Sequence, residues 1–199
     1  MPAPSTLALF ALAAIALIAI PGPNMLFIAA QSMARGRQAG FAAALGLLTG
    51  TLIYVAAAAA GVAAIIASSA LAFDALRYIG AAYLIYLGIK AWRTRDEPVS
   101  LDFQPGRAYR QAIVVQLLNP KVALFFLAFL PQFVDPERGP AATQVLVLGA
   151  ILGTLGLVMD CGYALIASFA QTRFGGLNRY AGVVYIALGA AAALTGGRR

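Results

Sequence analysis

Long apolar stretches with almost no charge run through this chain. The first 34 residues contain no lysine or arginine, and an apolar run extends from Leu45 to Ala67. A helix that crosses a membrane needs about 20 mostly apolar residues. The apolar residues follow one another instead of alternating with polar ones, which favours helices over a membrane barrel. Because the first stretch lacks a basic leader and exceeds the length of a signal sequence, we expect it to be retained as a span.

The composition excludes several classes of protein. Of 199 residues, 62% are apolar and 11% are charged, against about 25% charged in soluble proteins. So few charges cannot cover a soluble surface, and disorder requires low hydrophobicity. The net charge of +7 is explained by basic cytoplasmic loops, so no nucleic-acid partner is expected. One cysteine and no histidine exclude an internal disulfide, a histidine-ligated metal and a histidine-activated nucleophile. We therefore expect an all-α integral membrane protein that is not an enzyme and carries no cofactor.

Six membrane-spanning helices are expected. The predicted spans are Thr6–Gln31, Ala39–Ile66, Leu71–Trp92, Gln111–Phe133, Ala142–Ala170 and Asn178–Thr195. The only long polar stretch lies between the third and fourth spans. The chain is therefore predicted to consist of a three-helix unit (1–92), a cytoplasmic linker (93–110) and a second three-helix unit (111–199).

The basic residues predict the orientation, because they are enriched on the cytoplasmic side. Nine of them follow the first, third and fifth spans: Arg35, Arg37, Lys90, Arg93, Arg95, Arg107, Arg110, Arg173 and Arg179. Four lie on the opposite side: Arg77, Arg138, Arg198 and Arg199. Both termini are therefore expected outside the cytoplasm.

The two units share an internal repeat. The sequence GLLTGTL begins at Gly46 in the second span, and GAILGTL begins at Gly149 in the fifth. Similarly, G-x-x-Y followed by L-G begins at Gly80 in the third span and at Gly182 in the sixth. Each unit has an odd number of spans, so the second must enter the membrane from the opposite side. This inverted repeat is the usual architecture of secondary transporters.

Prolines interrupt the first and fourth spans at equivalent places, at Pro21-Gly22-Pro23-Asn24 and at Asn119-Pro120-Lys121. A proline removes a backbone donor, so Pro21 and Pro23 should free the carbonyls of Leu17 and Ala19, and Pro120 that of Gln116. Protein, water or a ligand must satisfy such groups in hydrocarbon. The helix N-termini after the breaks suit a carboxylate, the freed carbonyls suit an ammonium group, and Asn24 and Asn119 can cap the breaks or contact a ligand. Paired breaks predict a binding site between them.

Two charged residues, Lys121 and Asp160, lie deep within the predicted spans. At 1.5 Å per residue both are about 15–16 Å from the cytoplasmic ends of their helices, at the level of Asn24. Charges at such depth are costly, so both are expected to be functional. In one alternative they form a static ion pair that holds two helices together. In the other, Asp160 binds and releases a proton, and a substrate carboxylate competes with it for Lys121. The Gly-x-x-x-Gly pairs starting at Gly36, Gly46 and Gly149 permit close helix contact within one chain or between copies, so a homo-oligomer is left open.

These motifs resemble the LysE/RhtB family of amino-acid exporters over nearly the whole chain. The resemblance rests on the Pro21–Asn24 motif, on the glycines from Gly36 to Gly50 and, most strongly, on Asn119-Pro120-Lys121 followed by Phe125-Phe126 and Pro131-Gln132-Phe133. It implies export of amino acids or their derivatives across the inner membrane, driven by the proton-motive force. The family's aromatic-x-x-Gly motif before the fourth span reads Tyr109-Arg110-Gln111-Ala112 here, without the glycine. Asp160 and Tyr163 match an Asp that precedes a Tyr in the family's fifth helix.

The alternative functions are less compatible with the sequence. A cation or toxic-ion exporter of the same superfamily would need more than one deep carboxylate or thiol. Thiol-electron transfer needs paired cysteines, and a lipid phosphotransferase needs clustered Asp, His or Lys at the interface. One deep acid and one deep base suit a zwitterion, which slightly favours neutral amino acids over lysine or arginine as the substrate.

Overall fold

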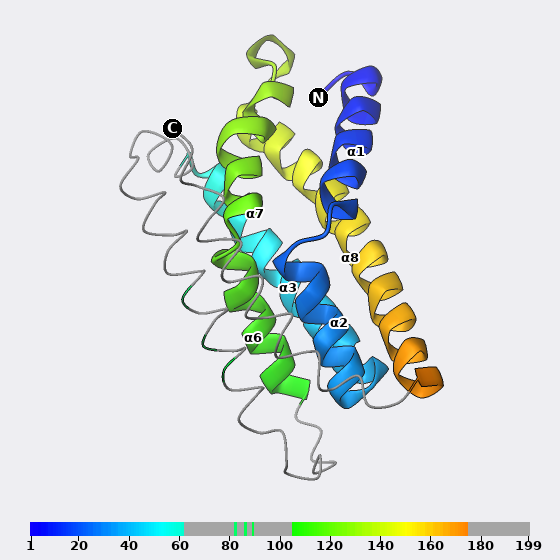
Figure 1. The fold of residues 1–199 in the computed structure, drawn as a ribbon. Coiled ribbons are helices and arrows are strands. Elements are labelled where there is room, and N and C mark those ends of the chain that lie inside the picture. Colours follow the sequence, from blue (N-terminus) through cyan, green and yellow to red (C-terminus); the bar gives the residue numbers. More distant parts are fainter. Residues whose placement is uncertain (62–81, 83–85, 87–88, 90–104, 175–199) are drawn as a thin grey trace, which may run out of the picture.

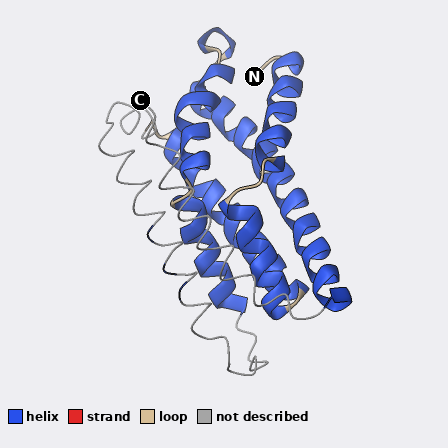
Figure 2. Cartoon of the chain, in the orientation of Figure 1, coloured by secondary structure: helices blue, strands red, loops and turns tan. Residues whose placement is uncertain are grey.

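The computed structural model describes residues 1–61, 82, 86, 89 and 105–174. These residues form helices and loops without a strand (Figure 2). The helices are α1 (Pro4–Ala19), α2 (Pro23–Arg35), α3 (Arg37–Ala59), α6 (Pro105–Leu117), α7 (Pro120–Leu124) and α8 (Ala141–Phe174). A π-helical segment (Phe125–Phe129) and two 3₁₀ segments (Leu130–Phe133 and Pro136–Arg138) connect α7 to α8. The predicted third and sixth spans lie outside the described residues, apart from three isolated positions in the third.

Two of the helices can cross a membrane unaided. α3 has 23 residues with a mean hydropathy of 1.9, and residues Ala141–Ala170 of α8 have a mean hydropathy of 2.0. They match the predicted second and fifth spans, although α3 ends at Ala59 and residues 62–66 of the second span are not described. The described part contains up to four candidate spans when each bent pair of helices counts as one.

The other two candidate spans are broken where the sequence predicts. α1 and α2 meet at a bend of 55°, and the α6 and α7 segments meet at a bend of 49° (Figure 1). Ile20, which precedes Pro21, is extended, as the residue before a proline tends to be. Pro23 and Pro120 each occupy the first turn of the next helix, where a missing N–H costs nothing. α6 begins at Pro105, six residues before the start expected for the fourth span.

The glycine pairs bring helices of this one chain into close contact. A Cβ at Gly46 would lie 2.2 Å from the carbonyl oxygen of Tyr109 on α6, and one at Gly50 would lie 2.6 Å from Gln116. A Cβ at Gly149 of α8 would lie 2.4 Å from Val55 on α3. Gly36 has a different role, because nothing lies within 4 Å of its added Cβ. Its φ of 82° makes the turn between α2 and α3.

Two apolar clusters result from this packing. One joins α2, α3, α6 and α8 and is centred on Phe27, Ile28 and Leu47. The other joins α1, α3, α8 and the segment after Pro120, and it contains Phe10, Phe125 and Phe126. The centroid of the Phe10 ring lies 5.8 Å from that of Phe125 and 5.1 Å from that of Phe133. The two breaks lie between these clusters, so the packing holds both interrupted segments at the same level.

The close approach of α3 to α6 predicts that Gly46→Ala destabilises the fold. The new methyl group would collide with backbone atoms of Tyr109, which cannot move as a side chain can. Overpacking of this kind costs about 1–3 kcal/mol. Thermal unfolding of purified protein in detergent should therefore occur at a lower temperature than for the wild type. Gly162→Ala on α8 is the matched control, because nothing lies within 4 Å of its added Cβ. Equal unfolding temperatures for both variants would contradict the tight contact.

Candidate functional site

Lys121 joins the two broken helices. Its Nζ atom donates hydrogen bonds to the carbonyl oxygens of Leu17, at 2.7 Å, and Ile20, at 2.8 Å. Leu17 lies in the last turn of α1 and Ile20 directly follows the helix, at the end where the helix dipole is negative and backbone acceptors lack intrahelical donors. The second break thus supplies the cation that satisfies the first. An ammonium group has three donors, and two of them are used here.

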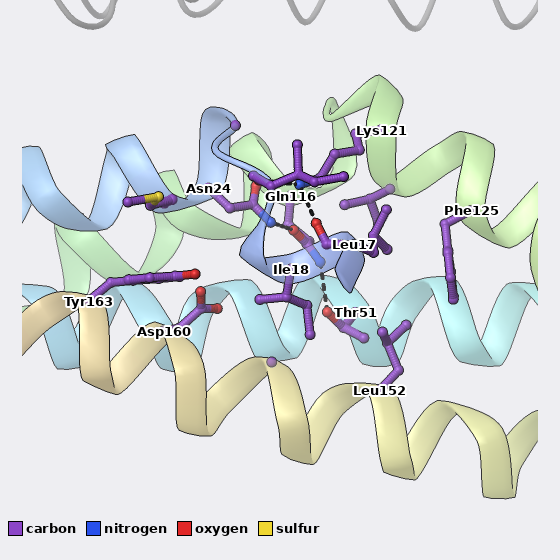
Figure 3. A pocket seen from close by; sticks show the side chains of 15 residues that line it. Leu17, Ile18, Asn24, Thr51, Gln116, Lys121, Phe125, Leu152, Asp160 and Tyr163 are labelled. Atoms are coloured by element: carbon purple, nitrogen blue, oxygen red, sulfur yellow. Dashed lines mark hydrogen bonds between the residues drawn. The ribbon is translucent and has the colours of Figure 1, made fainter. Parts of the chain in front are cut away.

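A chain of hydrogen-bonded side chains connects the breaks to α3, and each side chain in it donates to the next one (Figure 3). Asn119 accepts a bond from the backbone N–H of Lys121 at 3.0 Å and donates to Asn24 Oδ1 at 2.8 Å. Asn24 Nδ2 in turn donates to Gln116 Oε1, and Gln116 Nε2 donates to Thr51 Oγ1 at 2.7 Å. Thr51 completes the chain by donating to the carbonyl of Leu47 at 3.1 Å. Each amide uses both its donor and its acceptor, so these side chains hold one another in place.

A cavity lies beside this chain of amides. Its volume is about 60 Å³, which gives room for roughly four to six waters or a small ligand. Its walls come from α1, α2, α3, α6, α7 and α8 and from the start of the π-helical segment. One end carries Asp160 and Tyr163, and the other end carries the apolar side chains of Phe125 and Leu152 (Figure 3). The cavity therefore has a polar end and an apolar end.

Asp160 faces this cavity from α8. The residue is 8% exposed and lines the same cavity as Lys121. Among the residues that the structure describes, the only salt bridge of 4.0 Å or less joins Asp135 and Arg138 in the loop before α8. The described geometry therefore does not contain a contact ion pair between Asp160 and Lys121, which weighs against the static alternative considered from the sequence. The two opposite charges are instead separated across one cavity.

The predicted site residues divide into two groups. Those that line the cavity are Gly22, Asn24, Gln116, Lys121 and Asp160. Those that do not are Pro21, Pro23, Asn119 and Pro120, which shape the breaks behind it. Asn119 caps α7, as expected, whereas Gly22 and not Asn24 is the residue that precedes α2. The carbonyl of Gln116, which Pro120 was expected to free, accepts a bond from the backbone N–H of Asn119 at 3.2 Å.

Several residues of the cavity were not predicted as site residues. The polar ones are Thr51 and Tyr163; the others include Met25, Gly156, Leu152 and Phe125. Thr51 lies in the repeated GTL sequence, and Tyr163 follows Asp160 by three residues. Both features could have identified these residues as part of the site from the sequence. No sequence feature distinguishes the apolar residues of the cavity wall, because leucines and phenylalanines are common throughout the apolar stretches.

Comparison with known proteins identifies the family of this chain. The sequence pattern of the LysE type translocator family matches residues 15–196. The chain belongs to this family. Among curated relatives of this translocator, an uncharacterised membrane protein of Pseudomonas aeruginosa is 34% identical, over 90% of this chain and 91% of its own. The homoserine/homoserine lactone efflux protein of Salmonella typhimurium is 32% identical, over 85% and 87% of the two chains. The leucine efflux protein of the same organism is 31% identical, over 83% and 80%. No solved structure matches.

The contact of Lys121 with α1 predicts that Lys121→Met destabilises this translocator. The substitution keeps an apolar side chain of similar length but leaves two carbonyls without their donor. The bond to Leu17 is partly buried, and a buried group left unsatisfied costs about 1–3 kcal/mol, so thermal unfolding should occur at a lower temperature. Arg110→Met is the control, since its Nε also donates to a backbone carbonyl, that of Gly106, but in an exposed position where water can replace it. An unchanged unfolding temperature in Lys121→Met would mean that the two bonds contribute nothing.

Proposed function

We propose that this translocator is a secondary exporter that moves neutral amino acids or their derivatives out of the bacterial cytoplasm. The observation that carries the proposal is a cavity that holds one buried acid, one lysine ammonium and an apolar wall. These are the complements of the carboxylate, the ammonium group and the side chain of a neutral amino acid. The efflux proteins among the relatives support the same direction of transport and the same class of substrate.

The substrate carboxylate binds the ammonium group of Lys121, whose third donor has no partner among the described residues. The substrate ammonium group binds Asp160 across the cavity. Because no contact ion pair joins these side chains in the described structure, a zwitterion can enter without first breaking one. The amides of Asn24 and Gln116 supply further polar contacts, and their mutual hydrogen bonds fix their orientation.

Asp160 also carries the proton that drives export. A proton and a substrate ammonium group compete for this carboxylate, so only one of them is bound at a time. Protonation from the outside releases the substrate there, and substrate from the cytoplasm displaces the proton inward. The chain crosses the inner membrane six times as two inverted three-helix repeats, with the cavity near the midplane and both termini outside the cytoplasm. The two equivalent breaks support this arrangement.

The first prediction from this proposal concerns the substrate. Purified protein in proteoliposomes, loaded in turn with each of the twenty amino acids, should release a few neutral ones. An imposed gradient with the acidic side outside the vesicles should accelerate their efflux. Release of inorganic cations without any amino acid, from vesicles shown to contain folded protein, would instead identify the cation exporter that the sequence leaves as the alternative.

The second prediction concerns Asp160. Asp160→Asn keeps the shape of the side chain but removes its exchangeable proton, so efflux should no longer respond to the pH gradient. The measurement is the ratio of efflux rates with and without the gradient, in vesicles containing equal amounts of inserted protein. Glu137→Gln, in the exposed loop before α8, should keep the wild-type ratio. A wild-type ratio in Asp160→Asn would assign the proton to another group.

A further inference from the structure

We propose that Gly156 determines substrate selectivity, because its missing side chain leaves the space in which the substrate's aliphatic side chain lies. The inference rests on the proposed function and deepens it. It assigns to this translocator neutral amino acids with an aliphatic side chain of about the size of that of valine or leucine.

Three residues of α8 lie along the wall of the cavity. Leu152, Gly156 and Asp160 are spaced four residues apart, so they lie on one face of the helix, about 6 Å apart along its axis. All three line the cavity. A substrate whose ammonium group binds Asp160 therefore extends over Gly156 towards Leu152, and Gly156 forms the floor beneath it.

Helix packing does not account for a glycine at this position. On the same helix, an added Cβ would lie 2.4 Å from Val55 at Gly149 and 3.0 Å from Leu48 at Gly153, so close contact with α3 explains both. At Gly156 no atom of the described residues lies within 4 Å of an added Cβ. A glycine inside a helix is less favourable than an alanine. The open space at Gly156 thus belongs to the cavity and not to a helix interface.

The chemistry of the cavity wall indicates what fills this space. Lys121 and Asp160 are the only charged residues that line the cavity in the described part of the chain, and the substrate's own carboxylate and ammonium groups occupy both. No charge is left for a lysine, arginine or glutamate side chain. Beyond Gly156 the wall consists of Leu152, Phe125 and Val122, which favours a branched aliphatic group over a polar one.

The test compares two substrates within the same vesicles. Proteoliposomes are loaded with alanine and leucine carrying different isotopes, and the ratio of their efflux rates is measured for wild type, Gly156→Ala and Gly156→Val. A side chain at position 156 takes the space needed by the larger substrate. We expect leucine efflux relative to alanine efflux to fall at least tenfold in Gly156→Val and less in Gly156→Ala, since pockets discriminate by about 10–200-fold per misfitting group. Alanine efflux should change less than twofold.

Gly162→Val is the matched control. Gly162 lies on the same helix, an added Cβ there meets nothing within 4 Å, and the residue does not line the cavity. This variant should keep the wild-type ratio. If Gly156→Val also keeps the wild-type ratio, or slows both substrates equally while Gly162→Val does not, the proposal for Gly156 is overturned although the exporter function stands. If the wild-type protein releases no amino acid at all, the proposed function itself fails.

Discussion

A backbone carbonyl inside the hydrocarbon of a membrane needs a hydrogen-bond donor, and in this protein the donors come from a second broken helix. Pro21 lacks the N–H that would bond the carbonyl of Leu17, and the end of α1 leaves that of Ile20 without a helical partner; Lys121 supplies both donors. A lysine alone at this depth would be costly as well. Two unfavourable groups thus stabilise each other across the junction of α1 and α7. Neither break would be tolerated as easily without the other, which explains why both occur at one level of the fold.

The amide chain extends this mutual dependence to four helices. Asn119, Asn24, Gln116 and Thr51 come from α7, α2, α6 and α3, and each bond fixes the next amide's orientation. The close contacts at Gly46 and Gly50 place α6 near enough to α3 for Gln116 to reach Thr51. The glycines thus allow the close helix contact that the hydrogen bonds between the buried side chains require. These side chains form a rigid polar wall, opposite which Asp160 faces an open space.

Much of this arrangement could be predicted from the sequence, because its signals are local. The prolines identify both breaks, and counting residues from the basic helix ends places Lys121, Asp160 and Asn24 at a common depth. What the sequence could not supply is the rotation of each helix about its axis, which depends on packing between distant segments. For that reason Thr51 and Gly156 were not predicted as site residues, whereas Pro21 and Pro120 were included in the predicted site although they do not line the cavity.

If Asp160 carries the proton, as proposed, the charge of the substrate also decides how much energy the membrane potential supplies. If one proton enters for each substrate exported, a zwitterion leaves one net positive charge moving inward. The membrane potential then contributes about 2.3 kcal/mol per 100 mV, or about fiftyfold in concentration. A cationic substrate exchanged for one proton would move no net charge, and the potential would contribute nothing to its export. Under the proposed exchange of one proton for one substrate, both the pH gradient and the membrane potential would therefore drive export of a neutral amino acid, whereas only the pH gradient would drive export of a cationic one.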